Sequence, residues 1–465
     1  MKQRYLPLLL HVSVPYLLLA LLLFSLRGSA ADAAPPAKPN IVFLLIDDLA
    51  YADCGFNGGR EIQTPHIDRL AASGAVLEAH YVQPVCSPTR AALLTGRYAT
   101  RTGVYTVVRP RAKWGLPLQE RTLANALQEA GYTTAIVGKW HLGEFDPAYR
   151  PRSRGFQHQH GMFFGAIDHF THLRGAWHDW HHDDQERSEE GYSTHLITRE
   201  ACRLIGAQPP DKPLFLYVPY NAVHAPLQVP PRYLEPYGSL TGGRRTLAGM
   251  LAAVDEGIGQ IVASLERTGR RDQTLVVFSA DNGGPRPGSN GSLRGFKGSL
   301  YEGGTRGCAF ACWPGQIPAG QRIREPLHVV DWYPTLVNLA GGSLEQKQPL
   351  DGRDIWPLLT QQAPSPHDAI LSVQTPTRAA VRVGDWKLLS FSTPPAAGAA
   401  TGRARKKAAT PSPTLELYNL ATDPGETQNL AEQEPQRVTA LQARLNELLR
   451  DAVPARAPGD EPADE

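Results

Sequence analysis

The stretch NIVFLLIDD, residues 40–48, decides the fold class of this chain. Its continuous apolar run, 41–46, is typical of a strand buried on both faces of a mainly parallel sheet, since a strand with one wet face alternates. The run ends directly in two acids, Asp47 and Asp48. It therefore predicts an α/β protein that carries polar groups at the carboxyl edge of its sheet.

Three further apolar runs end in the same way. They are 134–137 before Lys139 and His141, 214–218 before His224, and 275–278 before Asp281 and Asn282. Ligands of open α/β sheets bind beyond the carboxyl ends of the strands, so these side chains are expected to meet at one edge.

Amphipathic segments between the strands predict helices that cover the sheet. They are 65–73 with Thr64 as N-cap, 118–130 and 247–264. The segment 150–192 lacks periodicity and is expected to run across the top of the sheet. Strand-like runs at 380–390 and 415–424, with an amphipathic helix at 435–449, predict a smaller C-terminal α+β subdomain with an antiparallel sheet.

The expected organisation has four parts and one internal loop. They are a signal peptide with a short linker (1–34), a catalytic domain (39–370), a C-terminal subdomain (371–450) with a low-complexity loop (394–413), and a disordered tail (451–465).

The N-terminus has the pattern of an export signal. Lys2 and Arg4 precede an apolar run at 17–26, and small residues follow at 28–31. This is the order of a cleaved secretory signal, and the apolar run is short for a membrane span of about 20 residues. We expect an exported protein, periplasmic or extracellular after cleavage, with no stable membrane anchor. The net charge of +2 gives no reason to expect nucleic acid as a partner.

The acids and the amide expected at the sheet edge suit a hard cation. Asp47, Asp48, Asp281 and Asn282 offer only oxygen ligands, which Ca²⁺ or Mg²⁺ prefer and zinc does not. One acidic pair alone is more often a cap or a solvated turn. Two pairs that each end a core strand favour a cation, because converging carboxylates repel one another.

Cationic side chains are expected around these oxygens. They are Arg90, Lys139, His141, His224 and either Lys297 or Arg294. A single histidine near a strand end is more often structural, but a metal combined with several fixed cations suits an oxyanion. Sulfate and phosphate esters are the natural substrates of such a site.

The run CSPTR, residues 86–90, matches the C-x-P-x-R signature of type I sulfatases, and AALLTGRY continues their extended signature. The segments IDDLAYADCGFNG, TPHIDRLAASG, GYTTAIVGKWHLG, AVHAPLQVP, FSADNGG and LYNLATDPGETQNLA also resemble sulfatase segments, in the same order. The resemblance covers about 39–430 and implies the alkaline-phosphatase-like sulfatase fold. Within the family, KPLFLYVPYNAVHAPLQVPPRYLEPY and LRGFKGSLYEGGTRG look most like the arylsulfatase B, or N-acetylgalactosamine-4-sulfatase, type.

The resemblance implies that a formylglycine-generating enzyme oxidises Cys86 to Cα-formylglycine (3-oxoalanine). It also assigns the other site residues. One Ca²⁺ would be bound by Asp47, Asp48, Asp281, Asn282 and the modified Cys86; Arg90 would hold the aldehyde hydrate; Lys139, His141, His224 and Lys297 would surround the sulfate, with Lys139, His224 and Lys297 contacting substrate. Arg294 stays the alternative to Lys297, which is favoured because it keeps the spacing to Glu302.

The implied reaction begins when one hydroxyl of the hydrated aldehyde attacks sulfur and the alcohol leaves, protonated by His224 or Lys297. The second hydroxyl, deprotonated by His141, then expels sulfate from the sulfo-enzyme intermediate by C–O cleavage. A serine has no second hydroxyl, so Cys86→Ser is predicted to trap a sulfated enzyme.

The expected substrate is a sulfated carbohydrate, with N-acetylgalactosamine 4-sulfate of chondroitin or dermatan-type glycans as the best match. Two alternatives stay open: a phosphonate monoester hydrolase or phosphodiesterase of the alkaline phosphatase superfamily, and a non-catalytic protein that binds sulfated glycans.

Three weaker features have two readings each. Seven histidines lie between 158 and 182 and form either part of the substrate cleft wall, which we favour, or a second metal site, although their spacing fits no standard zinc pattern. Arg109, Arg111 and Lys113 either bind acidic neighbouring sugars or form a solvated turn. Cys308 and Cys312 either pair or stay free.

Overall fold

The computed structural model describes Met1, residues 38–391 and residues 413–456. The expected signal peptide and the low-complexity loop, apart from Met1 and Pro413, lie outside the described residues, as do residues 457–465 of the tail.

A ten-stranded mixed sheet forms the centre of the fold, in the order β13-β2-β12-β11-β1-β10-β4-β5-β8-β9. The four strands predicted from apolar runs are neighbours in its middle: β1 (Asn40–Ile46), β4 (Thr133–Lys139), β10 (Leu214–Tyr220) and β11 (Thr274–Ala280). They pair in parallel, and Ile46 lies level with both Tyr220 and Ala280. Their carboxyl ends therefore meet at one edge, as expected.

Shorter strands extend the sheet on both sides. On one side β12 (Ala309–Cys312) is antiparallel to β11 and is followed by β2 (Ala75–Leu77) and β13 (Gln321–Ile323). On the other side β5 (His158–Met162) is parallel to β4 and is followed by β8 (His181–His182) and β9 (Gln185–Glu186). The segment 150–192 thus supplies three strands of the sheet, which its weak periodicity did not predict.

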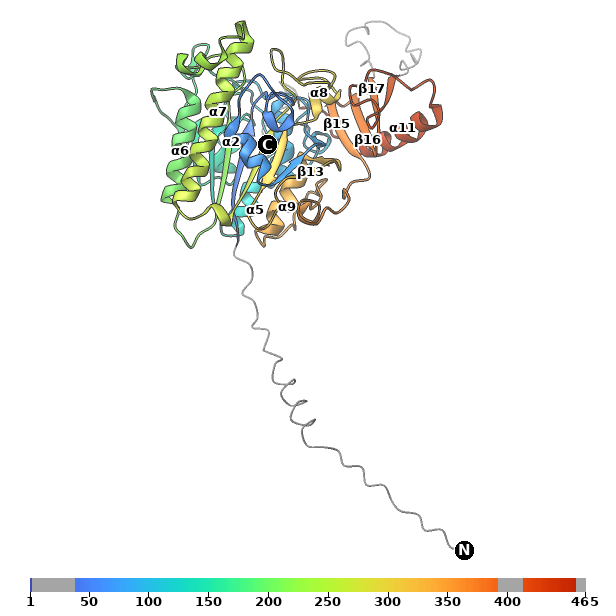
Figure 1. The fold of residues 1–465 in the computed structure, drawn as a ribbon, viewed down its shortest axis with the longest axis horizontal. Coiled ribbons are helices and arrows are strands. Elements are labelled where there is room, and N and C mark those ends of the chain that lie inside the picture. The colour runs from blue at the N-terminus through green and yellow to red at the C-terminus, as the bar shows by residue number, and fades with distance from the viewer. Residues whose placement is uncertain (2–37, 392–412, 457–465) are drawn as a thin grey trace, which may run out of the picture. The chain divides into compact units, whose positions relative to one another are not determined.

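Alternate residues of β1 enter two different hydrophobic cores. Val42, Leu44 and Ile46 pack with α2 (Pro65–Ala72), α6 (Ser193–Ala207) and α7 (Gly242–Arg267). Ile41, Phe43 and Leu45 pack with α3 (Cys86–Thr95), α5 (Leu123–Glu129) and α9 (Trp332–Leu339). Both faces of the sheet are thus covered by helices, with α6 beside α7 (Figure 1). The predicted α/β class with a mainly parallel sheet is confirmed.

Two helices differ in length from their predictions. The helix expected at 118–130 begins only at Leu123, because Thr122 and Asn125 form a capping box, and Leu118 is 53% exposed. Helix α7 is longer than 247–264 at both ends. By length and composition α7 could cross a membrane, but its apolar residues are buried against the sheet, α2 and α6, as in the core helix of a globular protein.

The C-terminal part contains the predicted antiparallel sheet. Its strands are β15 (Ile370–Thr375), β16 (Arg378–Val383), β17 (Trp386–Phe391) and β18 (Thr414–Asn419), paired in that order. Helix α11 (Pro435–Leu449) covers one face through Leu441 and Leu445, which belong to the same core as Phe43 (Figure 1). The beginning of the expected tail is anchored, because Val453 N–H donates to Thr100 O (2.8 Å) and Arg456 N–H to Gly103 O (3.0 Å).

The remaining elements are short and connect the larger ones. They are β3 (His80–Tyr81) paired with β14 (Leu327–His328), β6 (Leu173–Arg174) paired with β7 (Trp177–His178), α4 (Ala99–Thr102), α8 (Glu302–Thr305), α10 (Trp356–Gln361), and 3-10 turns at Gly55–Asn57, Pro147–Tyr149, Pro151–Arg154, Pro231–Tyr233, Glu235–Tyr237, Arg271–Gln273 and Val329–Asp331.

Candidate active site

The predicted oxygen ligands meet where β1 and β11 end. Asp48 N–H donates to Asp281 Oδ1 (3.2 Å), and Asn282 Nδ2 donates to Asp48 Oδ1 (2.8 Å). All four side chains, including Asp47, are buried. The alignment of two adjacent parallel strands is what brings Asp47 and Asp48 beside Asp281 and Asn282.

The donor set fits a divalent cation. Among the described residues, Asp47 Oδ1 and Asn282 Oδ1 are buried and accept no hydrogen bond. Burial, and then the charge of Asp47, raise the pKa of Asp281 above its usual value. Orphaned buried oxygens and a destabilised carboxylate are what a hard cation offsets. Ligand atoms of Asp47, Asp48, Cys86 and His224 all lie within 4.8 Å of one another.

Cys86 is the first residue of α3 and points into this cluster. The helix follows an extended Val85 and ends at Gly96, whose φ of 67° is in the left-handed region that suits glycine. Burial raises the pKa of the Cys86 thiol to about 12, so the thiol itself is a poor nucleophile at neutral pH. All five cysteines are free, so Cys308 and Cys312 do not pair.

Arg90 lies one turn after Cys86 and ties the helix to three strand ends. Its Nη2 is 2.8 Å from Asp281 Oδ2 and 4.0 Å from Asp47 Oδ1, and its Nη1 donates to the carbonyl of Lys139 (2.9 Å). The guanidinium is fully buried. Arg90 thus fixes residue 86 relative to the acids and supplies a permanent positive charge.

Lys139 is the last residue of β4 and His141 lies two residues beyond it; both approach from the other side. Lys139 Nζ donates to Asp47 Oδ2 (2.5 Å), which offsets burial and lowers the pKa of Asp47. Burial, and then the charges of Lys139 and Arg90, hold the pKa of His141 well below its usual value. Its Nδ1 has no hydrogen-bond partner within the described chain. His141 is therefore a neutral imidazole among cations, which suits a proton acceptor.

Lys297, rather than Arg294, reaches the site. Lys297 Nζ lies 2.6 Å from Asp48 Oδ1, and His224 Nε2 lies 3.6 Å from Asp48 Oδ2. Arg294 turns the other way and donates to Tyr418 OH (2.9 Å) and to the carbonyl of Glu426 (2.8 Å). The structure thus separates two residues that the sequence left as alternatives.

A cavity of about 460 Å³ opens onto these groups. Its lining includes Cys86, His141, His224 and Lys297, together with Val107, Val108, Arg109, Pro110, Gly165, Ala166 and Arg174. All ten predicted site residues therefore gather within one region, and four of them line its opening.

No sequence pattern predicted two of the residues that line the cavity, Gly165 and Arg174. A Cβ at Gly165 would lie 2.3 Å from His141 Nε2, so only glycine leaves room for that imidazole. Arg174 comes from the short β6–β7 hairpin, whose position no periodicity predicts. Arg109 lines the cavity, whereas the Arg111 guanidinium lies 5.4 Å from the ring of Trp177.

None of the seven histidines between 158 and 182 is among the residues that line this cavity, although Gly165, Ala166 and Arg174 of the same segment are. Their role in the wall of a larger substrate cleft stays a prediction. His169 alone touches the site from behind, because its Nε2 is 3.1 Å from the carbonyl oxygen of His224.

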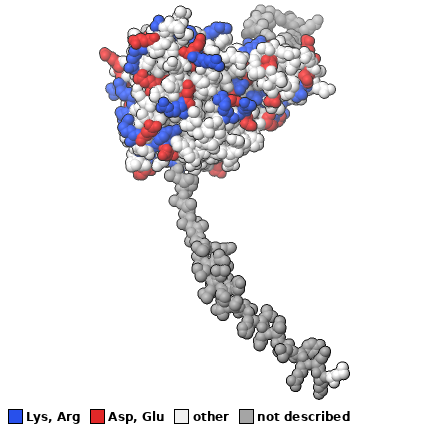
Figure 2. Space-filling model, viewed as in Figure 1, with Lys and Arg blue, Asp and Glu red and all other residues white. Residues whose placement is uncertain are grey.

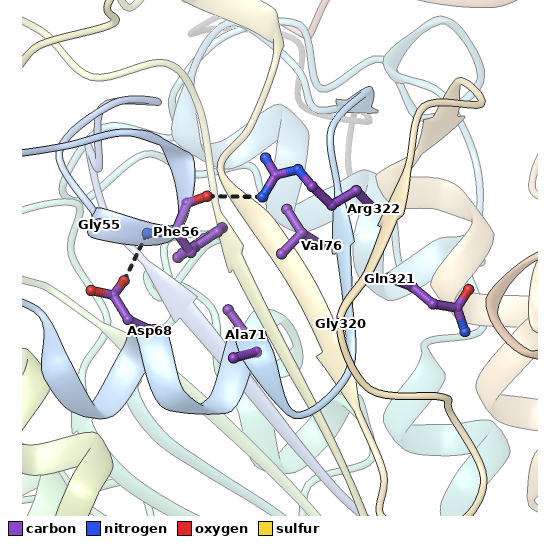
Figure 3. A pocket seen from close by; sticks show the side chains of 9 residues that line it. Gly55, Phe56, Asp68, Ala71, Val76, Gly320, Gln321 and Arg322 are labelled. Atoms are coloured by element: carbon purple, nitrogen blue, oxygen red, sulfur yellow. Dashed lines mark hydrogen bonds between the residues drawn. The ribbon is translucent and has the colours of Figure 1, made fainter.

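Another hollow, of about 400 Å³, lies between α2 and β13 (Figure 3). Its charged side chains are already engaged, since Asp68 accepts from Phe56 N–H (2.8 Å) and Arg322 donates to Phe56 O (3.2 Å). The visible face of the molecule mixes positive and negative side chains (Figure 2). The gathering of cationic side chains at the site is therefore local and does not extend over this face of the molecule.

Oxygen ligands for a hard cation, buried cations and an open cavity at the carboxyl edge of an α/β sheet define a hydrolase of oxyanion esters. Comparison with known proteins identifies the family. The model of the Sulfatase family matches residues 39–343, and the chain belongs to this family of sulfuric ester hydrolases.

Several relatives support the assignment. The chain is 36% identical to arylsulfatase J of Mus musculus, over 93% of this chain and 79% of the relative. It is 34% identical to arylsulfatase A of Homo sapiens, over 95% and 94%. It is 35% identical to N-acetylgalactosamine-6-sulfatase of Mus musculus, over 73% and 69%.

Solved structures agree on the fold. The structure of Ps i-CgsB in complex with k-i-k-neocarrahexaose superposes with a TM-score of 0.81 at 32% identity, over 90% of this chain and 94% of that one. Phosphonate monoester hydrolase of Agrobacterium radiobacter shares the fold, with a TM-score of 0.64 at 19% identity. The predicted alkaline-phosphatase-like sulfatase fold and the type I family are thereby confirmed. The 4-sulfatase type within the family is not singled out.

Proposed function

We propose that this sulfatase of sulfated glycans removes the 4-sulfate of N-acetylgalactosamine in chondroitin or dermatan-type chains. The observation that supports the activity is that the buried oxygens of Asp47 and Asn282 accept no hydrogen bond from the described residues. Lys139, His224 and Lys297 surround this group of acids at one cavity. One relative named N-acetylgalactosamine-6-sulfatase, and the similar structure of Ps i-CgsB in complex with k-i-k-neocarrahexaose, support a saccharide substrate.

In the proposed site Asp47, Asp48, Asp281 and Asn282 bind Ca²⁺ together with residue 86. When present, Ca²⁺ and the formylglycine made from Cys86 supply charge stabilisation and the attacking hydroxyl. Lys139, His224 and Lys297 bind the sulfate oxygens, and Arg90 holds residue 86 in place.

Two histidines divide the proton transfers. His141 is neutral and buried, so it takes a proton from residue 86. His224 Nδ1 is 2.6 Å from the carbonyl of Ala225, which leaves Nε2 facing the site. Lys297 shares its protons with Asp48 at 2.6 Å, so His224 is the better donor to the leaving alcohol.

Arg109 and Arg174 favour a polyanionic glycan over an isolated sulfate ester. Both line the cavity that Cys86 and Lys297 enter, and neither belongs to the acid cluster. Their guanidinium groups can pair with a carboxylate or a second sulfate on a neighbouring sugar, because arginine binds such groups in a bidentate manner.

The substrate test compares sulfate release from saccharides that differ only in sulfate position, with aryl phosphate and phosphonate monoesters as controls. We expect the 4-sulfated N-acetylgalactosamine saccharide to give the highest kcat/KM. A faster 6-sulfated or carrageenan saccharide would contradict the proposed sulfate position but leave the sulfatase activity intact. Faster phosphonate cleavage would favour the phosphonate hydrolase alternative. Glycan binding without any cleavage, by protein whose residue 86 is mature, would favour the non-catalytic one.

The role of residue 86 is tested by mass spectrometry of its tryptic peptide. We expect the exported wild-type protein to carry formylglycine there, which also tests maturation by the formylglycine-generating enzyme. Cys86→Ser should stop after one turnover with a covalent sulfate on residue 86. Rapid multiple turnover by this variant would contradict the mechanism.

The metal is tested with EGTA followed by back-titration. Activity and thermal stability should both fall on chelation, because three buried carboxylates lose their counter-charge. Ca²⁺ should restore both at lower concentration than Mg²⁺; the reverse order would contradict the proposed ion.

A further inference from the structure

A second cluster of potential ligands lies on the outer strands of the sheet, apart from the catalytic cavity. His158 and His160 belong to β5, His182 to β8, and Asp183 to the turn that follows. The ring centroids of His158 and His182 are 5.0 Å apart, and those of His160 and His182 are 5.6 Å apart. His158 lies level with Ala135 of β4, four residues before Lys139, so the cluster sits below the catalytic edge.

We propose that His158, His182 and Asp183 form a second metal site, suited to Zn²⁺ or a similar borderline ion. One ligand atom from each of the three lies within 4.8 Å of the other two. Two imidazoles and a carboxylate are a common zinc donor set, unlike the all-oxygen set at the catalytic edge. The site would leave a fourth position for water.

The ring of His158 is oriented as in known metal sites. Its Nε2 is 2.7 Å from Glu200 Oε1, and Glu200 is itself held by Arg203 through contacts of 2.7 Å. The opposite nitrogen, Nδ1, lies 3.1 Å from Asp183 Oδ1. Metal-bound histidines characteristically donate their second ring nitrogen to a carboxylate, which leaves the first unprotonated for the ion.

The ring of His182 has a comparable partner. Its Nδ1 is 3.4 Å from Nδ1 of His160, whose Nε2 is 3.3 Å from Glu189 Oε2. His160 Nε2 makes no hydrogen bond within the described residues, so the ring of His160 is held at Nδ1, which accepts when His182 Nδ1 carries the proton. His182 Nε2, 3.9 Å from Asp183 Oδ2, is then the unprotonated nitrogen. Both histidines can thus present a lone pair towards the same carboxylate.

Hydrogen bonds hold Asp183 in place before any ion binds, and its side chain is partly exposed to solvent. Its N–H donates to Gln159 O (2.8 Å), and its Oδ1 accepts from Gln159 N–H (2.9 Å). The side chains of His158, His182 and Asp183 are 14%, 43% and 33% exposed, which gives an ion a direct path from solution.

A bound ion would brace one wall of the catalytic cavity. It would join β5 to the turn between β8 and β9. Asp179 lies two residues before β8, and its carboxylate accepts from Phe163 N–H (3.0 Å) and from Phe164 N–H (2.6 Å). Phe164 immediately precedes Gly165, which makes room for His141.

The test is a calorimetric titration of the Ca²⁺-saturated protein with Zn²⁺, together with the visible spectrum of the Co²⁺ form. We expect one Zn²⁺ per chain, with Kd raised at least tenfold in His182→Gln and in Asp183→Asn. Thermal melting without Zn²⁺ checks that both variants fold. His178→Gln is the matched control, because His178 lies in a different hairpin and pairs with Glu186.

Two outcomes would overturn the proposal. Equal Zn²⁺ affinity in the wild type and both cluster variants would leave the cluster as ion pairs only. Zn²⁺ binding that survives in the cluster variants but is lost in Cys86→Ala would place the zinc at the catalytic edge. A Co²⁺ spectrum of four- or five-coordinate type that disappears in Asp183→Asn would support the site.

Discussion

Lys297 Nζ lies 2.6 Å from Asp48 Oδ1, so the glycine-rich loop after β11 is joined to the end of β1 at the catalytic cavity. The pair accompanies the position of Lys297 in the lining of the cavity, which its neighbour Arg294 does not enter. It also leads directly to a paired mutational test.

Lys297→Met should lower kcat/KM for an aryl sulfate by about 10²–10³-fold, the usual effect of removing one fixed donor to a developing anion. Arg294→Gln is the matched control in the same loop. Because Arg294 contacts Tyr418 and Glu426 instead, its loss should lower the melting temperature more than the activity. Equal losses of activity in the two variants would refute the assignment.

Gly165→Ala should impair catalysis through His141. The new Cβ would lie 2.3 Å from His141 Nε2, so the imidazole must move. We expect kcat to fall at least tenfold with little change in the far-ultraviolet circular dichroism. Gly206→Ala in α6 is the control, since nothing lies within 4 Å of its Cβ and alanine favours a helix. Unchanged kcat in Gly165→Ala would show that His141 is not held by this contact.

Lys387→Met should destabilise the whole protein. Lys387 Nζ is buried between Glu302 Oε1 (2.8 Å) and Glu426 Oε1 (2.9 Å). Its loss removes the cation beside the buried Glu426 and leaves Glu302 with the longer ion pair to Arg306 Nη1 (3.5 Å). The unfolding free energy should fall by about 3–5 kcal/mol in urea titrations. Arg444→Met breaks a pair with Asp368, which is 82% exposed, and should cost less than about 1 kcal/mol. Similar losses in both would contradict the buried-pair account.

Because of His80, we expect the folded protein to lose stability in mild acid. Burial lowers its pKa to about 3, and its Nε2 accepts from Trp332 Nε1 (3.2 Å). Below pH about 6.5 the unfolded chain binds a proton that the folded chain excludes, so stability falls by up to about 1.4 kcal/mol per pH unit. His80→Gln should give a shallower slope in urea titrations between pH 7.5 and 5. A wild-type slope in His80→Gln would contradict the prediction.

Local patterns were enough for the centre of the fold, and together with the family resemblance they picked out the residues that gather at the cavity. The apolar run before Asp47 and the matching run before Asp281 define adjacent strands, and strand alignment then brings their acids together. Periodicity did not predict positions that depend on a helix cap or on contacts between distant parts of the chain. The start of the helix at Leu123 depends on the Thr122 cap, and Arg174 reaches the cavity through a two-residue pairing.

The histidine cluster shows the same limit of patterns along the chain, which do not reveal how strands pair. His158 and His160 share one face of β5 because strand residues alternate, and His182 joins them only through antiparallel pairing. A search for fixed ligand spacing along the chain cannot detect a set that is completed across strands.

Glu302 follows Lys297 in the glycine-rich loop, yet its carboxylate and its N–H are held by Lys387 and Glu426, beyond the region matched by the family model. For protein engineering, the loop and the C-terminal sheet therefore form one structural unit and should be exchanged together. A chimera that exchanges the loop between sulfatases without its distant anchor should lose activity even when every catalytic side chain is kept.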